Sequence, residues 1–373
     1  MNSLYIHVPF CKSRCIYCDF YSTTFGQDIM AAYAKALERE MLLRRQYINN
    51  KCTRVHTIYL GGGTPSLLPL DILKALFEAV GRTFSIDKEA EVTIEANPDD
   101  VTREWLQGLT ETPVNRISMG AQTFNDKLLN VLGRRHNARQ TVDAVKACKE
   151  AGINNISLDL IYGLPGQTMD DWQSDVEKAL SLGITHLSAY SLTFEEGTRL
   201  FSMLKQGLVE EADEELSRRM YDYLMSATKQ AGFLHYEISN FALPGYHSRH
   251  NNSYWQGAPY LGIGAGAHSY DGQRSRRANL PDVKAYIAAR GDVPHTTEEL
   301  GDEELYNEFV MTRLRTCDGI PLGELAPEAR HYCLSMAEPH LANHLLCIRD
   351  NHLCLTKEGI FTSNDIISDL FVS

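Results

Sequence analysis

The first half of the chain alternates short β-rich runs with longer segments of helical period, and this alternation limits the fold more than any other feature. The β-rich runs cover residues 4–8, 55–60, 91–96, 116–119, 156–161 and 186–192. Segments with apolar residues at helical spacing lie between them, at residues 28–47, 70–81, 102–109, 138–151 and 169–182. Six strands separated by five helices are typical of successive βαβ units. The sequence therefore predicts a parallel α/β sheet or an incomplete (β/α)6 barrel.

Three of these runs end in turns that are rich in glycine, proline or polar residues. Gly61 to Pro65 follows the second run, Asn97 and Pro98 follow the third, and Gly163 to Gly166 follows the fifth. Parallel α/β proteins bind their ligands at the carboxyl ends of the strands. We therefore expect a functional site at one edge of the sheet.

The sequence pattern divides the chain into three parts. Residues 1–200 are expected to form the barrel core, and residues 201–294 to extend it. After Gly291 the pattern changes to helices, with a short β-like ending over residues 353–361. We expect residues 295–373 to form a small, mainly helical C-terminal domain.

Charge and hydropathy argue against several classes of protein. The 373 residues include 36 Lys and Arg against 48 Asp and Glu, a net charge of −12 without a long basic run. This composition does not support a nucleic-acid interface or a polybasic membrane patch. No stretch approaches the ~20 uninterrupted apolar residues of a transmembrane helix, and the N-terminus lacks the pattern of a signal peptide. We therefore expect a cytoplasmic protein.

Three of the nine cysteines, Cys11, Cys15 and Cys18, lie close together directly after the first predicted strand. Three thiolates suit an iron–sulfur cluster or zinc, but a zinc site would normally add a fourth Cys or His at comparable spacing. Three ligands to a four-iron cluster leave one iron open to a substrate or cofactor. A structural zinc site and plain thiols are the alternatives. The other six are expected to be small buried residues: Cys52, Cys148, Cys317, Cys333, Cys347 and Cys354.

The Cys-x3-Cys-x2-Cys spacing resembles the hallmark of the radical S-adenosylmethionine (radical SAM) superfamily. The resemblance implies a TIM-like, incomplete (β/α)6 radical SAM barrel that holds a [4Fe–4S] cluster on Cys11, Cys15 and Cys18. It also implies that S-adenosylmethionine (SAM) chelates the open iron. Gly61 to Pro65 resembles the family's glycine-rich motif, which meets the methionine amino group of SAM. Glycines after a strand let the backbone approach such a ligand, although a bare turn would have the same composition.

The resemblance narrows to the subfamily of oxygen-independent coproporphyrinogen III oxidases and covers nearly the whole chain. Six segments match in the family's order: Tyr5 to Cys11, Gly62 to Pro65, Glu95 to Pro98, Ser118 to Phe124, Leu132 to Arg134 and Asp159 to Thr168. By this resemblance ten residues should contact SAM: Tyr5, Tyr17, Gly62, Gly63, Thr64, Glu95, Gln122, Arg134, Asp159 and Ile263. Taken singly, Glu95, Gln122 and Arg134 also fit ordinary structural roles, and their shared placement after successive strands favours the ligand.

Two features resemble the heme-chaperone branch of this subfamily, HemW, more than the oxidases. The oxidases carry a further cysteine two positions after the third ligand and a long extension before the cluster, whereas this chain has Phe20 there and Cys11 near its start. Arg249 to Trp255 matches the His-Asn-x-x-Tyr-Trp signature of HemW. The resemblance implies a heme site in which His250 ligates the iron, since imidazole is a common axial ligand.

Other residues would complete or compete for this heme site. Asn251, Tyr254 and Trp255 are expected to shape it, and His7, His247 and His268 are secondary candidates for heme contact. The structural alternative is a buried packing cluster of histidine and aromatic side chains.

The function implied by the resemblance is that of a heme chaperone. Such a protein would bind heme and deliver it to client hemoproteins such as respiratory-chain components, with the cluster, SAM and an electron donor supporting the transfer. The alternatives are an oxygen-independent coproporphyrinogen III oxidase or another radical SAM enzyme. The sequence leaves open whether the chain forms a homodimer, and whether it lies at the periphery of the inner membrane.

Overall fold

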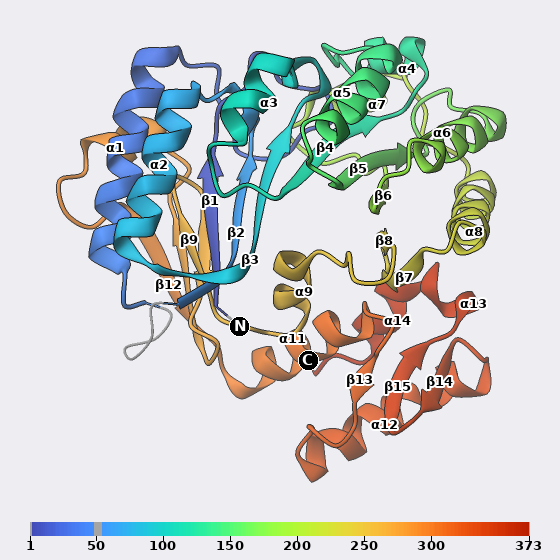
Figure 1. The fold of residues 1–373 in the computed structure, drawn as a ribbon. Coiled ribbons are helices and arrows are strands. Elements are labelled where there is room, and N and C mark those ends of the chain that lie inside the picture. The colour runs from blue at the N-terminus through green and yellow to red at the C-terminus, as the bar shows by residue number, and fades with distance from the viewer. Residues whose placement is uncertain (1, 48–53, 373) are drawn as a thin grey trace.

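A sheet of twelve strands runs through the larger part of the protein (Figure 1). The computed structural model describes residues 2–47 and 54–372, and all numbers of strands and helices refer to these residues. The strand order in the sheet is β12-β11-β10-β9-β1-β2-β3-β4-β5-β6-β8-β7. A separate three-stranded sheet lies in the C-terminal part.

Six neighbouring strands at the centre of the sheet are parallel and follow one another in chain order. They are β1 (Ser3–Val8), β2 (Arg54–Gly62), β3 (Ser85–Ala96), β4 (Arg116–Gln122), β5 (Asn155–Tyr162) and β6 (His186–Ser191). The connecting helices include α1 (Gln27–Arg44), α2 (Leu70–Thr83), α3 (Arg103–Leu109), α5 (Ala138–Glu150) and α6 (Met169–Ser181). The six predicted strands and five predicted helices are thus confirmed. The sequence missed α4 (Asp126–Val131), which is too short to show a helical period.

The sheet is open, which confirms the predicted incomplete (β/α)6 barrel. On one side, β9 (Tyr260–Ile263) pairs in parallel with β1. On the other side, β6 pairs with the antiparallel strand β8 (Asn240–Ala242), which pairs with the edge strand β7 (Leu234–Glu237). Because β1 to β6 are parallel, the loops after them meet at the same edge.

Beyond β9 the sheet continues with three antiparallel strands. These are β10 (His268–Tyr270), β11 (Ser275–Asn279) and β12 (His295–Glu299). A buried ion pair holds this extension against α1, because Arg44 donates to Glu40 (2.9 Å), to the carbonyl of Gly262 (2.9 Å) and to the hydroxyl of Ser269 (2.9 Å). A buried charge pair of this kind needs such additional hydrogen bonds to offset its desolvation. The network fixes β9 and β10 relative to the barrel helices.

Four further helices lie between β6 and the C-terminal part in the order of the chain. They are α7 (Arg199–Lys205), α8 (Glu214–Gln230), α9 (Arg249–Trp255) and α10 (Val283–Ala288). The carboxylate of Glu91 on β3 accepts from the backbone N–H groups of Arg249 and His250, at 3.0 Å each. This acceptor ties the first turn of α9 to the sheet, since the first N–H groups of a helix have no partner within it.

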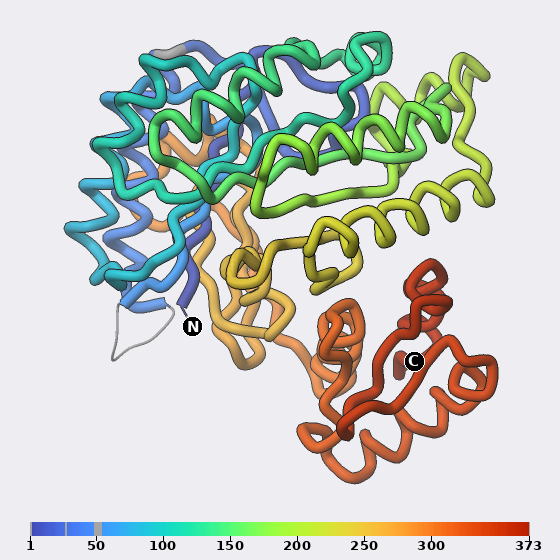
Figure 2. The backbone as a smooth tube through the Cα atoms, turned by 45° about the vertical axis from the view of Figure 1, so that its right-hand side comes forward, coloured from blue at the N-terminus to red at the C-terminus, as the bar shows by residue number. Residues whose placement is uncertain are grey.

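A second hydrophobic core defines the C-terminal part, which lies below the rest of the chain in orange to red (Figure 2). Its elements are α11 (Asp302–Leu314), β13 (Ile320–Pro321), α12 (Pro327–Ala342), β14 (Leu346–Arg349), β15 (His352–Leu355), α13 (Lys357–Ile360) and α14 (Ser363–Asp369). Buried members of this core extend from Val310 to Leu370. Residues 295–299, which the sequence assigned to this part, form β12 of the main sheet, so the second core begins with α11.

Two smaller expectations were wrong. The β-like ending predicted over residues 353–361 is a strand only as far as Leu355, because Thr356 caps a helix by accepting from the N–H of Gly359. Of the cysteines expected to be buried, Cys317 is exposed and Cys347 is half-buried, while Cys148, Cys333 and Cys354 are buried. Cys52 lies outside the described residues. Within the described part of the chain, no helix is long and apolar enough to cross a membrane.

Candidate functional site

The loop after β1 carries Cys11, Cys15 and Cys18, and all three line a cavity of about 230 Å³. Backbone hydrogen bonds hold the loop in place: the N–H of Cys11 donates to the carbonyl of Thr23 (2.8 Å) and that of Thr64 to the carbonyl of Phe10 (2.8 Å). A Cβ atom at Gly63 would lie 2.7 Å from the carbonyl oxygen of Phe10. The glycine motif after β2 is therefore required for the close approach of the two loops.

Two side chains from other loops donate to the cysteine sulfurs. Thr64 Oγ1 lies 3.6 Å from Cys11 Sγ, and Arg134 Nη1 lies 3.4 Å from Cys15 Sγ. Arg134 also donates to the carbonyl of Gly120 (2.7 Å) and to the side chain of Asn97. Burial raises the pKa of the Cys18 thiol to about 11, so binding of iron must displace its proton. Cationic and hydroxyl donors around the sulfurs favour the thiolate form that a metal needs.

Two half-buried carboxyl groups, those of Glu95 and Asp159, line the same cavity. Glu95 at the end of β3 accepts from the backbone N–H of Gly62 (3.0 Å) and from the hydroxyl of Tyr59 (2.8 Å). Burial raises the pKa of Glu95 to about 7 and that of Asp159 on β5 to about 6. Carboxylates held in a poorly solvated site favour a cationic ligand, because its charge offsets the cost of their ionisation.

Gln122, at the end of β4, has a left-handed backbone conformation with φ of 64°. The pairing of β4 with β5 shifts register between Gly120 and Gln122. A residue other than glycine in this region costs of order 1–3 kcal/mol, and such strain clusters at ligand sites. The side chain of Gln122, which lies at this register shift, lines the cavity.

The cavity brings together eight of the ten residues predicted to contact SAM: Tyr17, Gly62, Gly63, Thr64, Glu95, Gln122, Arg134 and Asp159. Tyr5 and Ile263 are not in its lining. Ile263 is fully buried on β9 beside Ile6, and Tyr5 faces a second cavity. Sequence reasoning missed Asn97, Ser118 and Tyr190, which also line the first cavity. Asn97 and Tyr190 lie just after or near a strand end, which was the signal that could have identified them, whereas Ser118 lies within β4.

The three cysteines all line the same cavity. Among the described residues, no group of three or more His, Cys, Asp or Glu side chains is placed to hold a single metal ion. In a [4Fe–4S] cluster each thiolate binds a different iron, so the sulfurs must be spread around the inorganic core. The donor set of three cysteines around one cavity therefore fits a cluster with one open iron.

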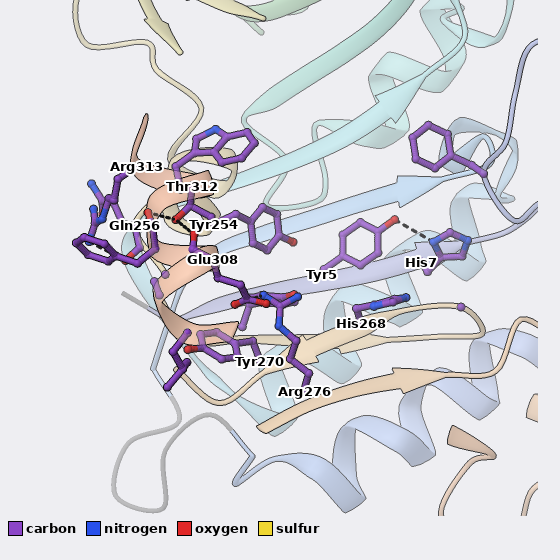
Figure 3. Close-up of a pocket in the computed structure, with 18 of the residues that line it drawn as sticks. Tyr5, His7, Tyr254, Gln256, His268, Tyr270, Arg276, Glu308, Thr312 and Arg313 are labelled. Carbon is purple, nitrogen blue, oxygen red and sulfur yellow. Dashed lines mark hydrogen bonds and ion pairs between the residues drawn. The ribbon is translucent and has the colours of Figure 1, made fainter. Parts of the chain in front are cut away.

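The second cavity is larger, about 770 Å³, and lies between the sheet and the C-terminal part (Figure 3). Its lining comes from β1, from α9, from the extension β9 to β11 and from α11. Aromatic residues dominate it: Tyr5, Phe20, Tyr21, Tyr254, Trp255, Tyr260, Tyr270 and Phe309. His7, His268, Arg276, Glu308 and Arg313 add polar groups. The sequence had identified only some of these residues, since no local pattern connects α11 to β1.

His250 is only 1% exposed and does not line this cavity. Its Nδ1 is hydrogen-bonded to Thr57 Oγ1 (2.8 Å) and its Nε2 to the hydroxyl of Tyr254 (2.8 Å). Burial, followed by the charge of Arg116, lowers the pKa of His250 to about 3. Both ring nitrogens are thus engaged within the protein, as in the packing cluster that the sequence left open as an alternative.

The other residues assigned to the heme site divide between two environments. Tyr254 and Trp255 line the second cavity, while Asn251 is not in its lining and its N–H donates to the capping residue Ser248 (3.3 Å). Of the secondary candidates, His7 and His268 line the cavity. His247 stacks on Tyr236 at 4.3 Å instead.

Comparison with known proteins gives consistent results. The model of the Radical SAM superfamily matches residues 5–179, and that of the HemN C-terminal domain matches residues 300–362. The chain is 40% identical to the heme chaperone HemW of Lactococcus lactis subsp. lactis, over 86% of this chain and 83% of that protein. It is 34% identical to the heme chaperone HemW of Mycobacterium tuberculosis, over 98% and 94%.

The chain belongs to the HemW family of radical SAM proteins. Membership assigns the [4Fe–4S] cluster and SAM as cofactors, and the cysteine loop is the part of the first cavity that can hold the cluster. The chain also superposes on the coproporphyrinogen III oxidase HemN of Escherichia coli with a TM-score of 0.84 over 100% of this chain and 90% of that one. At 20% identity this likeness concerns the fold alone. HemW relatives, in contrast, match this chain at 34–40% identity.

Proposed function

We propose that this protein is a heme chaperone that binds heme, transfers it to client hemoproteins, and carries a [4Fe–4S] cluster and SAM. The observation that carries the proposal is its likeness, over most of its length, to several proteins named heme chaperone HemW. The large aromatic cavity supports it, because flat aromatic side chains suit a planar macrocycle. A volume of about 770 Å³ also falls in the range of small-molecule sites.

The first cavity would serve the cluster and SAM. Cys11, Cys15 and Cys18 would bind three irons, and the bound cluster would supply the electron that SAM chemistry requires. Arg134 would orient the SAM carboxylate, since a guanidinium is the natural partner of that group. Glu95 and Asp159 would accept from the hydroxyl groups of the ribose or face the positive charge of the ligand.

A hemin titration followed by a transfer assay tests the proposal. Protein reconstituted with iron and sulfide without oxygen should bind hemin with a saturable change of the Soret band. It should then pass the heme to an apo-hemoprotein whose Soret maximum differs. A protein that takes up no hemin, or that never releases it to any acceptor, would contradict the proposed function.

The second candidate function is oxygen-independent oxidation of coproporphyrinogen III, which the likeness of the fold to HemN favours. Phe20 stands where the resemblance places a further cysteine in the oxidases, and its side chain is 64% exposed at the cavities. We expect no protoporphyrinogen when the reconstituted protein is incubated anaerobically with coproporphyrinogen III, SAM and a reductant. Sustained product formation would replace the chaperone with the oxidase.

Several finer predictions accompany the proposal. Four points stay predictions: respiratory-chain components are clients, a separate protein donates electrons, the chain forms a homodimer, and it lies in the cytoplasm, with or without contact with the inner membrane. Mass determination in solution tests the homodimer, co-purification tests the clients and the electron donor, and cell fractionation tests the location.

A further inference from the structure

Three histidines lie in or beside the aromatic cavity, and their ring nitrogens differ in availability. Both nitrogens of His250 are hydrogen-bonded, to Thr57 and Tyr254. Those of His7 are hydrogen-bonded to the hydroxyl of Tyr5 (2.9 Å) and the carbonyl of Tyr21 (3.1 Å). His268, on β10, lines the cavity, is exposed, and makes no ring hydrogen bond to any residue that the structure describes.

We propose that heme binds in this aromatic cavity with the imidazole of His268 as an axial ligand of the iron, and that His250 supports the site from behind. The inference rests on the proposed function and deepens it, because it assigns the place and the iron ligand. An axial ligand must offer a nitrogen lone pair to the metal. His268 can do so without breaking a hydrogen bond in the described structure, whereas His250 and His7 cannot.

The walls of the cavity provide flat surfaces for the macrocycle. Tyr254 comes from α9 and Tyr270 from β10 (Figure 3). Trp255 of α9 and Phe309 of α11 also line the cavity. His250 fixes the orientation of Tyr254 through the hydrogen bond to its hydroxyl, and Tyr254 packs edge-on against Tyr260 at 4.7 Å. His250 is therefore a positioning residue in this site, and its effect on heme passes through Tyr254.

Guanidinium groups in the same lining can bind the two propionates of heme. Arg276 on β11 is paired with Glu308 of α11 (2.7 Å), and its Nε has no partner among the described residues. Arg313, also on α11, donates to the carbonyl of Gln256 (3.3 Å). Arginine binds carboxylates through two parallel hydrogen bonds, so these residues suit the acidic edge of the ligand. Glu308 also lines this cavity, so a propionate bound to Arg276 would share the guanidinium of Arg276 with the carboxylate of Glu308.

The fold explains how the axial ligand and the cations face one cavity. His268 and Arg276 lie on the neighbouring strands β10 and β11, where His268 pairs with Ala278 and Tyr270 with Arg276. The opposite wall is α11, in the part of the chain that the HemN C-terminal domain model matches. The site thus requires both parts of the molecule, which gives the C-terminal part a role in ligand binding.

Hemin titration of three variants tests the assignment of the iron ligand. In His268→Ala, the histidine-ligated ferric heme signature in optical and electron paramagnetic resonance spectra should be lost, with affinity for hemin lower by on the order of tenfold. Added imidazole should restore the spectrum. His250→Ala should keep the iron signature with weaker binding, and His331→Ala, an exposed histidine on α12, should match the wild type.

Separate measurements check that each variant is folded and that it binds hemin. Cluster absorbance and circular dichroism report the fold of each variant, and His268→Met provides a second substitution whose thioether should shift the spectrum. Hemin dimethyl ester should bind the wild type and Arg276→Ala equally, while free hemin should distinguish them. If the spectra of His268→Ala and His268→Met equal those of the wild type while His250→Ala loses the signature, the inference fails and the chaperone function stands. If the wild type takes up no hemin, the proposed function fails with it.

Discussion

The two cavities differ in size, in lining and in how far apart along the chain their residues lie. The cluster cavity has about 230 Å³ and is lined by cysteines, glycines and polar groups from loops and strand ends between Cys11 and Tyr190. The aromatic cavity has about 770 Å³ and combines Tyr5 near the N-terminus with Arg313 in the C-terminal part. Site residues that follow successive parallel strands can be recognised from short motifs, whereas a cavity between two cores depends on packing across the whole chain.

The largest effect is expected when the cluster is removed, because this change should affect one cavity and not the other. A triple variant with Cys11, Cys15 and Cys18 each changed to Ala should contain almost no iron or sulfide after reconstitution, because no cluster ligand remains. Hemin should still bind, since none of these cysteines lines the aromatic cavity. Metal analysis and hemin titration check the two outcomes. Cys317→Ser, at an exposed cysteine, should leave both values unchanged. Loss of hemin binding in the triple variant would show that the cavities depend on each other.

The next effect acts on the aromatic cavity alone. Trp255→Ala should weaken hemin binding about tenfold, because the lost aromatic contact contributes ~1.5 kcal/mol. The indole N–H of Trp255 has no hydrogen-bond partner among the described residues, so truncation leaves no polar partner unsatisfied. SAM binding, measured by isothermal titration, should stay the same, and Trp255→Phe should recover most of the hemin affinity. An equal loss in both measurements would indicate general damage to the fold.

A smaller effect concerns the pH dependence of the cluster cavity. Burial raises the pKa of Glu95 to about 7, so this group is mostly protonated at pH 6 and mostly ionised at pH 8. A cationic ligand prefers the ionised form, and SAM should therefore bind more tightly as the pH rises from 6 to 8. Glu95→Gln should reduce this dependence, while hemin binding should show no such change in either protein. An identical pH profile for SAM in the variant would exclude Glu95 from contact with the ligand.

The smallest effect tests the backbone strain at Gln122. Gln122→Gly should raise the free energy of unfolding by about 1 kcal/mol, because glycine adopts a positive φ without steric cost. The same variant should bind SAM less tightly, since the side chain that lines the cluster cavity is gone. Denaturant unfolding and SAM titration measure the two changes. Gln122→Ala is the matched control, and it should lose affinity without the gain in stability.

Much of the barrel was predictable because its signals are local. Each central strand has a run of apolar residues, and each cluster ligand lies in one short loop. The strand β12, His295–Glu299, gave no signal because all five residues are exposed and the strand forms by backbone pairing with β11. The sequence also did not predict which cavity the side chains of a strand face. Tyr5 and His7 share one face of β1 by the two-residue period of a strand, but only the packed structure places that face towards the aromatic cavity.

The prediction of the site residues likewise succeeded where the signal is local and failed where it depends on packing. The placement of Glu95 and Gln122 in the cavity lining followed from their positions at the ends of β3 and β4, whereas Arg134 lies in the loop between α4 and α5. The burial of His250 did not follow from the sequence, because its hydrogen-bond partner Thr57 lies on β2, far away in the sequence. A motif can name a histidine, but it does not report which neighbours already occupy its nitrogens.

Phe20 belongs to the linings of both cavities and lies two residues after Cys18. The segment from Cys18 to Phe20 therefore contributes to both linings. A cluster bound to Cys18 would fix the backbone two residues before Phe20, and two peptide units allow little independent movement. Filling the first cavity would thus also limit where the Phe20 ring can lie in the second.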